Sequence, residues 1–274
     1  MPSNRQPVLA ISHGGGPCFQ VELSPPFTPE VWAPLKVHLA ELGLALEPRP
    51  RAILAISGHW EEKVPTVGIM PEHTLLFDYY GFPAEAYQLR YPAKGAPDVA
   101  ERARLLLAES GIDSRADDKR GLDHGIFVPF MVMFPDADIP IVPLSLRADL
   151  DPAFHIAVGS ALASLRDEGV LIIASGNSYH NMEGFRLGYK AGLEARLFGA
   201  WLDETMTIVS PDARKDRLVA WEQAPGARSR MSVTISSHRR RGRLQLAPSL
   251  ISRCAVTRVV RWTSSTYIAS WSSS

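Results

Sequence analysis

The sequence predicts an α/β fold: a single domain with a largely parallel or mixed central sheet flanked by helices, in a phosphorylase/hydrolase-like arrangement. Three short apolar runs begin at Val8, Ala52 and Val170, and Gly or Ser residues follow each of them. Such runs are typical of strands buried on both faces, as in a sheet covered by helices. Segments with apolar residues at helical spacing separate the runs, and this alternation favours parallel strands.

The remaining elements follow from apolar spacing and from the residues at their ends. The predicted helices span residues 30–46, 98–110, 126–134, 152–168, 189–206 and 211–221, and two further strands span residues 66–70 and 139–146. Thr28 and Asp151 stand where an N-cap is expected, because their short polar side chains can bond the first backbone N–H groups of a helix. Gly111 and Gly169 follow predicted helix ends, where glycine is favoured.

The composition indicates a globular protein of a reducing compartment. Of the 274 residues, 46% are apolar, which suffices for a full core. The two cysteines have no CxxC spacing, so we expect no disulfide framework and a cytoplasmic location. The most apolar window, residues 125–134, is too short to span a bilayer, and no signal-peptide apolar region follows the polar first residues. We therefore expect no membrane partner.

The net charge of zero hides an uneven distribution. Residues 228–274 carry nine arginines and no Lys, Asp or Glu, so residues 1–227 hold 20 basic and 29 acidic side chains, a net charge of −9. Nucleic acid is therefore not an expected partner of this negative part of the chain. We predict an α/β domain over residues 1–227 and an atypical, irregular Ser/Arg-rich tail over residues 228–274.

Two explanations of the tail stay open. One is a solvated or RNA-binding arm, because His238-Arg-Arg-Arg-Gly-Arg243 is densely basic. The other is a shifted reading frame. With GC-rich codons, reading residues 230–238 from the third base of each codon gives His-Glu-Arg-His-His-Leu-Leu-Pro, a string with metal-binding residue types. The nucleotide sequence of codons 222–274 decides between the two explanations.

Three histidines stand just beyond predicted strands. His13, His59 and His180 each closely follow an apolar run and have small neighbours that leave room for a ligand. Because ligands collect at the carboxyl ends of parallel strands, we predict that the three imidazoles share one metal ion. A lone histidine is more often structural, so the joint pattern carries this prediction. His38 and His155 lie inside predicted helices and are assigned no role.

The ligand types leave the chemistry of such a site open. Neutral imidazole suits iron, zinc, copper and nickel. Two histidines and a carboxylate with open positions form the site of non-haem Fe(II) oxygenases, whereas three histidines around zinc suit hydrolysis. Glu61 and Glu62 lie near His59 in the sequence, but nothing in the sequence supports either one as the carboxylate ligand.

Two glycine-containing turns are further candidates for the site. His13-Gly-Gly-Gly16 is not a GxGxxG dinucleotide sequence, and its match to an esterase oxyanion motif lacks the GxSxG elbow which that reaction requires. We interpret it as a tight turn that approaches another group closely, and we expect that group to be a metal-bound substrate. In Asp123-His-Gly125, His124 can donate a hydrogen bond near the site; a helix N-cap with an incidental histidine is an equally good interpretation.

Six segments occur together along the chain in the order His13-Gly, Ser57-Gly-His-Trp60, Phe77-Asp-Tyr-Tyr-Gly-Phe-Pro83, Leu122-Asp-His-Gly125, Phe134-Pro-Asp-Ala-Asp-Ile-Pro140 and Ala174-Ser-Gly-Asn-Ser-Tyr-His-Asn181. The combination resembles the class III extradiol ring-cleavage dioxygenases, in particular the DOPA 4,5-dioxygenase-like branch. The resemblance covers residues 8–225. No single segment is decisive, but six segments in the same order are specific.

The resemblance implies an activity and the residues that carry it. The activity is the opening of a catechol-type aromatic ring with O₂, at a metal centre that uses Fe(II) and sometimes binds Zn(II) in its place. The resemblance makes His13 and His59 metal ligands. It makes His180 the acid/base histidine close to the metal and, in some members, a ligand of bound zinc. It makes His124 a further catalytic histidine beside the ligands, and the protein a homodimer.

Two departures from the family pattern affect this expectation. The family commonly has His-Gly-Ser-Pro where this chain has His13-Gly-Gly-Gly-Pro17, a change that would reshape the substrate pocket. The family's C-terminal x-x-Glu-His-Leu-Leu-Pro, which carries its last metal-site residue, is absent, and the arginine-rich tail stands in its place. We therefore expect an extradiol dioxygenase impaired by its C-terminus. A zinc-dependent hydrolase and a non-catalytic metal-binding relative are the alternatives. Tyr79, Tyr80 and Phe82 are candidates for packing against a substrate ring.

Overall fold

The computed structural model describes residues 4–25, 27–180 and 189–227. The described chain divides into two compact units, one that runs to Asn177 and one that begins at Ser178. The tail predicted over residues 228–274 lies outside the described residues.

The first unit is built on a six-stranded mixed sheet with the strand order β1-β6-β2-β5-β3-β4. The strands are β1 (Val8–Ile11), β2 (Ala52–Glu62), β3 (Thr66–Gly68), β4 (Arg115–Asp117), β5 (Ile141–Arg147) and β6 (Val170–Ser175). The pairs β1·β6, β6·β2 and β2·β5 are parallel, whereas β3 runs antiparallel to β5. The α/β class and the mixed sheet are thus confirmed, and β1, β6, β2 and β5 end at one common edge.

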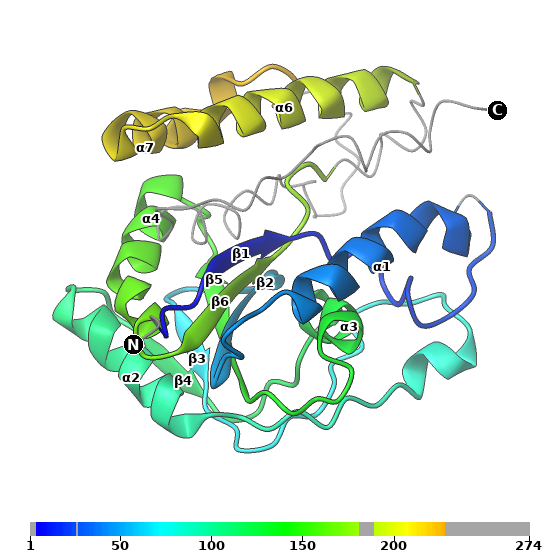
Figure 1. Cartoon of the computed structure of the whole chain (residues 1–274), viewed down its shortest axis with the longest axis horizontal. Coiled ribbons are helices and arrows are strands. Elements are labelled where there is room, and N and C mark those ends of the chain that lie inside the picture. Colours follow the sequence, from blue (N-terminus) through cyan, green and yellow to red (C-terminus); the bar gives the residue numbers. More distant parts are fainter. Residues whose placement is uncertain (1–3, 26, 181–188, 228–274) are drawn as a thin grey trace. The chain divides into compact units, whose positions relative to one another are not determined.

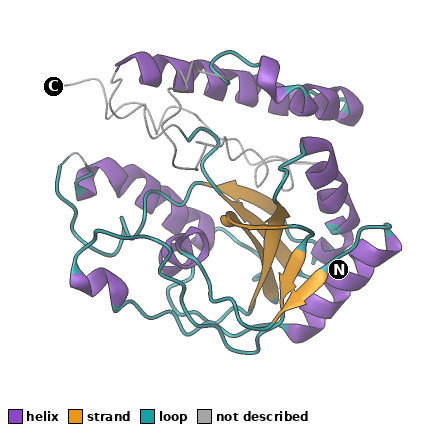
Figure 2. Cartoon of the chain, turned by 180° about the vertical axis from the view of Figure 1, so that it is seen from behind, coloured by secondary structure: helices purple, strands orange, loops and turns teal. Residues whose placement is uncertain are grey.

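Helices cover both faces of the sheet (Figures 1 and 2). They are α1 (Pro29–Leu44), α2 (Pro97–Glu109), α3 (His124–Met133) and α4 (Pro152–Ala161), with short 3-10 helices at Ala84–Tyr87 and Ala163–Arg166. Successive strand residues point to opposite faces. Leu54 and Ile56 of β2 accordingly join the core under α2 and α4, whereas Ile53 and Ala55 join the core under α1 and α3. This explains why the strands read as continuous apolar runs rather than alternating ones.

Several predicted boundaries differ from the structure for local reasons. The helix predicted over residues 152–168 ends at Ala161 and gives way to a 3-10 turn, although Asp151 does cap it by accepting a hydrogen bond from the Ala153 N–H (3.0 Å). Thr28 occupies the N-cap position of α1 without making a side-chain capping bond. The three-residue strand β4 was not predicted, because its Arg-Ala-Asp sequence has no apolar pattern.

The second unit contains α6 (Tyr189–Thr207), α7 (Pro211–Val219) and a 3-10 turn at Trp221–Gln223, close to the two helices predicted there. Phe198 is fully buried and contacts the rings of Tyr179 and Trp201. Ser210 caps α7 by accepting a hydrogen bond from the Ala213 N–H (3.3 Å). Among the described residues, no helix combines the length and the apolar character that crossing a bilayer requires.

Candidate metal centre

Two of the predicted histidines reach the carboxyl edge of the sheet from strands on either side of β6. His13 follows the last residue of β1 by two positions and is 1% exposed. His59 lies inside β2, not after it, because the strand continues to Glu62. Beyond Ile56 the pairing of β2 with β5 shifts: β2 advances by five residues, from Ile56 to Glu61, while β5 advances by two. A bulge of this kind re-aims side chains and is common beside functional sites. Here it carries His59 beyond the end of β6.

The third histidine of the site, His124, is the first residue of α3. Asp123 occupies the N-cap position, but its side chain makes no capping bond. The His124 backbone N–H donates instead to Oδ1 of Asp78, 3.0 Å away, in the irregular segment after β3. The interpretation of Asp123 as a capping side chain is therefore wrong, and a carboxylate distant in sequence satisfies the first N–H group of the helix.

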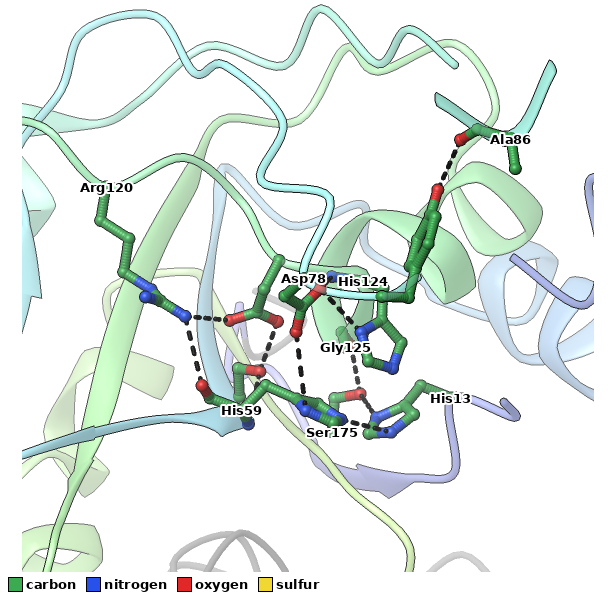
Figure 3. Close-up of polar contacts among 11 residues, drawn as sticks. His13, His59, Asp78, Ala86, Arg120, His124, Gly125 and Ser175 are labelled. Carbon is green, nitrogen blue, oxygen red and sulfur yellow. Dashed lines mark hydrogen bonds and ion pairs between the residues drawn. The ribbon is translucent and has the colours of Figure 1, made fainter. Parts of the chain in front are cut away.

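The imidazoles of His13, His59 and His124 converge on one point (Figure 3). The Nε2 atoms of His13 and His59 lie 3.1 Å apart. The ring centroids are 4.1 Å apart for His59 and His124, 4.9 Å for His13 and His59, and 5.2 Å for His13 and His124. One nitrogen from each ring lies within 4.8 Å of the other two. His13 and His124 are buried, and the side chain of His59 is 24% exposed.

Each ring is held on the side of its Nδ1 atom. Nδ1 of His13 lies 3.1 Å from the hydroxyl of Ser175, the last residue of β6, and this hydroxyl donates to the Gly125 carbonyl. Since the Ser175 proton is used in that bond, its oxygen accepts the Nδ1–H of His13. Nδ1 of His124 donates to Oδ1 of Asp78 (2.8 Å), and Nδ1 of His59 lies 3.6 Å from Oδ2 of the same carboxylate.

Two carboxylates differ in their electrostatic surroundings. Burial favours the neutral form of Asp78, but the hydrogen bonds and charge of His124 outweigh it and lower the pKa of this carboxyl group. Asp123 is fully buried; burial raises its pKa, and the negative charge of Asp78 adds to this effect. Asp123 accepts hydrogen bonds from the Ser57 hydroxyl (2.6 Å) and from Arg120 (3.1 Å).

Arg120 braces the strand that carries His59. Its guanidinium donates to the His59 carbonyl oxygen (3.2 Å) and lies 5.2 Å from the centroid of the Trp60 ring. Together with the bond to Asp123, these contacts tie the bulge of β2 to the N-terminus of α3. The relative positions of His59 and His124 are therefore set by these polar contacts of Arg120 as well as by the strand pairing.

The glycine turn after His13 approaches side chains of this chain. A Cβ atom on Gly14 would lie 2.3 Å from Sγ of Cys18, and one on Gly16 would lie 2.7 Å from the Phe82 ring; both glycines have positive φ angles. The tight turn is therefore confirmed, and Cys18 and Phe82 are side chains that it approaches; its approach to a metal-bound substrate stays a prediction. Burial raises the pKa of the Cys18 thiol to about 12, so it packs as a neutral group.

The aromatic candidates divide by their exposure. Tyr79 is buried, donates its hydroxyl to the Ala86 carbonyl (2.6 Å) and lies 5.9 Å, centroid to centroid, from the His124 ring. Tyr80 is 91% exposed. Phe82 is half-buried and lies edge-on to Tyr79. The Tyr79 ring thus packs against His124, and its hydroxyl is hydrogen-bonded to the backbone of this chain.

His180, Glu61 and Glu62, which the sequence also singled out, are not members of this group. His180 is half-buried and belongs to the second unit, five residues after the end of β6. Glu62 accepts a hydrogen bond from the Trp60 indole (3.1 Å). Among the described residues, His13, His59 and His124 are the one group that can hold a metal ion, and neither Glu61 nor Glu62 belongs to it.

Asp78 and Ser175 are the site residues that sequence reasoning missed. Asp78 stood inside the quoted segment 77–83, but that segment has no helical or strand periodicity that would place it. Ser175 was counted only as a strand residue. Asp78 contacts His59 and His124, which lie 19 and 46 positions away along the chain. Ser175 contacts His13, 162 positions away, and sequence spacing cannot reveal such contacts.

The donor set fits a divalent transition metal. Three imidazole nitrogens suit iron, zinc, copper or nickel. The 3.1 Å between the Nε2 atoms of His13 and His59 is about the separation of two nitrogens that lie roughly 2.0–2.1 Å from one ion at neighbouring positions. A site with three protein nitrogens leaves positions for other ligands, which is the arrangement of a catalytic rather than a structural metal.

Comparisons with known proteins place the chain among aromatic ring-opening dioxygenases. The family model of the catalytic LigB subunit of aromatic ring-opening dioxygenase matches residues 7–226. The chain is 45% identical over 161 residues to the 4,5-DOPA dioxygenase extradiol of Beta vulgaris, covering 58% of this chain and 60% of that protein. It is 37% identical over 182 residues to the protein of the same name in Escherichia coli K12, covering 66% of this chain and 63% of that protein. The chain thus matches less than two thirds of the length of either relative.

A solved structure extends the similarity to the fold. An uncharacterized protein from Escherichia coli K12 superposes with a TM-score of 0.66 at 29% sequence identity, covering 92% of this chain and 90% of that chain. The family model matches 220 of the 274 residues, and the solved structure shares the fold. The chain belongs to the family of the catalytic LigB subunit of aromatic ring-opening dioxygenases.

Proposed function

We propose that this protein is a non-haem Fe(II)-dependent extradiol dioxygenase that opens a catechol-type ring with O₂, and that Zn(II) can take the place of iron. The observation that carries the proposal is the convergence of His13, His59 and His124 at the carboxyl edge of the sheet. Family membership supports it, and relatives that share 37–45% sequence identity are named extradiol dioxygenases.

His13 and His59 are the proposed ligands of the ion, and their Nε2 atoms face one another across 3.1 Å. When bound, the ion supplies Lewis acidity toward the two catechol hydroxyls and a redox-active centre for O₂. The protein's part is to hold these nitrogens in place and to move protons. The buried surroundings of His13 and His124 exclude bulk water from one side of the site, which strengthens the electrostatic interactions there.

His180 is the proposed acid/base residue. It would take the second catechol proton as a general base, and it is also a candidate zinc ligand, as the family resemblance implies. Chain connectivity supports this role: His180 follows Ser175 by five residues, and the Ser175 hydroxyl contacts His13. This role requires His180 to lie close to the bound ion.

His124 has two roles open to it at the centre. The sequence assigns it a hydrogen bond to oxygen as charge develops there, an electrostatic contribution to the transition state. The geometry also puts one of its nitrogens among the candidate ligand atoms. Because Nδ1 is bound to Asp78, Nε2 is the atom that faces the centre in both roles, but the roles differ there: donation to oxygen requires a hydrogen on Nε2, whereas metal binding requires its lone pair.

The proposal is tested by loading the metal-free protein with Fe(II) under nitrogen, adding a catechol and then admitting air. We expect O₂ consumption and a yellow ring-opened product, at a rate lowered by the altered C-terminus. Stoichiometric metal with no O₂ consumption for any catechol would contradict the proposal and favour the zinc-dependent hydrolase. Substoichiometric metal would favour the non-catalytic relative.

Single substitutions assign the histidines within the same assay. His13→Ala and His59→Ala should lose metal. His180→Ala should abolish turnover but keep most of the metal affinity if His180 is a base, and lose metal if it is a ligand. His124→Ala should lose metal only if His124 is a ligand. The homodimer and the cytoplasmic location stay predictions, as does the division at residue 227.

A further inference from the structure

Asp78 lies against two of the three clustered histidines, which come from different elements (Figure 3). Oδ1 accepts hydrogen bonds from the His124 backbone N–H (3.0 Å) and from Nδ1 of its ring (2.8 Å). Oδ2 lies 3.6 Å from Nδ1 of His59. The side chain is 19% exposed, so water shares little of this contact. One carboxylate thus touches a residue of β2 and a residue of α3 on the same side of both rings.

A carboxylate that faces an imidazole determines which ring nitrogen carries the proton. An ionised carboxylate only accepts hydrogen bonds, so the nitrogens that face it are N–H donors. Nδ1 of His124 is therefore protonated. Nδ1 of His59 lies 3.6 Å from the same carboxylate, beyond hydrogen-bond distance, but the nearby negative charge favours a proton on this nitrogen. In the neutral imidazole the other nitrogen, Nε2, then carries the lone pair. Asp78 lies on the Nδ1 side of both rings, so it is not itself placed as a ligand of an ion held by the Nε2 atoms.

We propose that Asp78 is a positioning residue of the metal centre. It holds His59 and His124 as Nδ1-protonated tautomers with both Nε2 atoms turned to the ion, while Ser175 does the same for His13. The inference rests on the proposed function, because it assumes that an ion binds at this cluster. Asp78 acts through the two rings and touches neither the ion nor the substrate.

Asp123 does not share this role, although it is nearby and more deeply buried. Its oxygens accept hydrogen bonds from Ser57 and Arg120, and no described contact joins them to an imidazole nitrogen. The two carboxylates therefore form a natural comparison. Removing either one replaces a carboxyl group beside the centre, but only the removal of Asp78 deletes the carboxylate that faces the Nδ1 atoms.

The first variant is Asp78→Asn, measured by competition titration of the metal-free full chain with Zn(II). Asparagine keeps the shape and one acceptor oxygen, which can still receive the His124 N–H, but its NH₂ group cannot accept from His59. We expect zinc affinity to fall about 10- to 100-fold, the usual effect of losing such a partner of a metal ligand. Asp78→Glu restores a carboxylate and should keep more affinity than Asp78→Asn, and it replaces that variant if the latter fails to fold.

A second measurement separates orientation from general destabilisation. Long-range ¹H–¹⁵N NMR spectra of the imidazoles report the tautomer of each histidine in the metal-free protein. We expect Nδ1–H tautomers for His59 and His124 in the wild type, and a shift of His59 to the Nε2–H tautomer in Asp78→Asn. The matched control is Asp123→Asn, the same replacement at the neighbouring carboxyl group, which should keep both tautomers and lose less affinity than Asp78→Asn.

The outcomes distinguish a failure of the proposed metal centre from a failure of the role proposed for Asp78. A wild-type protein that binds no zinc overturns the proposed metal centre and the inference with it. Tight binding by the wild type, with equal affinity in Asp78→Asn, overturns the inference alone. Unchanged tautomers in Asp78→Asn also overturn it, whatever happens to activity.

Discussion

At the scale of single residues, close packing around the imidazoles limits which side chains the site accepts. A Cβ atom on Gly125 would lie 2.7 Å from Oγ of Ser57, 3.0 Å from Oδ1 of Asp123 and 3.1 Å from Cδ2 of His59. The carbonyl of the same glycine accepts the Ser175 hydroxyl that orients His13. A side chain at position 125 would therefore push against Ser57, Asp123 and the His59 ring.

We predict that Gly125→Ala destabilises the protein by about 1–3 kcal/mol, the usual cost of forcing a methyl group into a packed interior. It should also weaken metal binding, because His59 has to move. Urea unfolding and metal titration measure the two effects. Gly199→Ala, in the middle of α6 with no atom within 4 Å of the added Cβ, is the matched control and should stabilise by about 0.5–1 kcal/mol. Unchanged metal affinity in Gly125→Ala would contradict the packing argument.

At the scale of elements, buried histidines also join helices to strands away from the site. His155 of α4 is buried; its Nδ1–H donates to the Asp151 carbonyl (2.7 Å), and its Nε2 accepts the Arg147 backbone N–H at the end of β5 (3.0 Å). The bond to Nε2 requires the neutral ring, because a protonated Nε2 would face another N–H group. Burial accordingly lowers the pKa of His155 from 6.5. The absence of a catalytic role, assumed from its place in a helix, agrees with this structural use.

The lowered pKa predicts how stability depends on pH. Above about pH 6.5, His155 is neutral in both states and contributes fully; as the pH falls below 6.5, the unfolded chain gains a proton before the folded one, so stability is lost. The difference in unfolding free energy between wild type and His155→Gln should therefore shrink from pH 7.5 to pH 5.5, measured by urea titration. Between pH 7.5 and pH 9 the difference should not change. A difference that is constant from pH 5.5 to pH 7.5 would contradict the neutral assignment.

At the scale of the whole molecule, the three clustered histidines connect β1, β2 and α3, so an ion bound there links distant parts of the first unit. Binding to the folded state alone stabilises it by about 2.7 kcal/mol when the free metal is at 100 times its Kd. For a chain of this size that corresponds to a rise in Tm on the order of 5–10 °C. We predict this rise when Zn(II) is added to EDTA-treated protein in a thermal melt. His13→Ala should not show it, and a rise of equal size in that variant would place the binding elsewhere.

The sequence by itself determined the α/β class, the main helices and strands, and the position of His13 after a strand. These features depend on local spacing, which the hydrophobic effect converts directly into buried faces. The six segments in register also pointed to the family to which the chain belongs. The tertiary structure alone decided the strand order, the bulge that moves His59 into β2, the distances among the three rings, and the contacts of Asp78 with His59 and His124. Each of these depends on contacts between residues far apart in the chain, for which local pattern carries no signal.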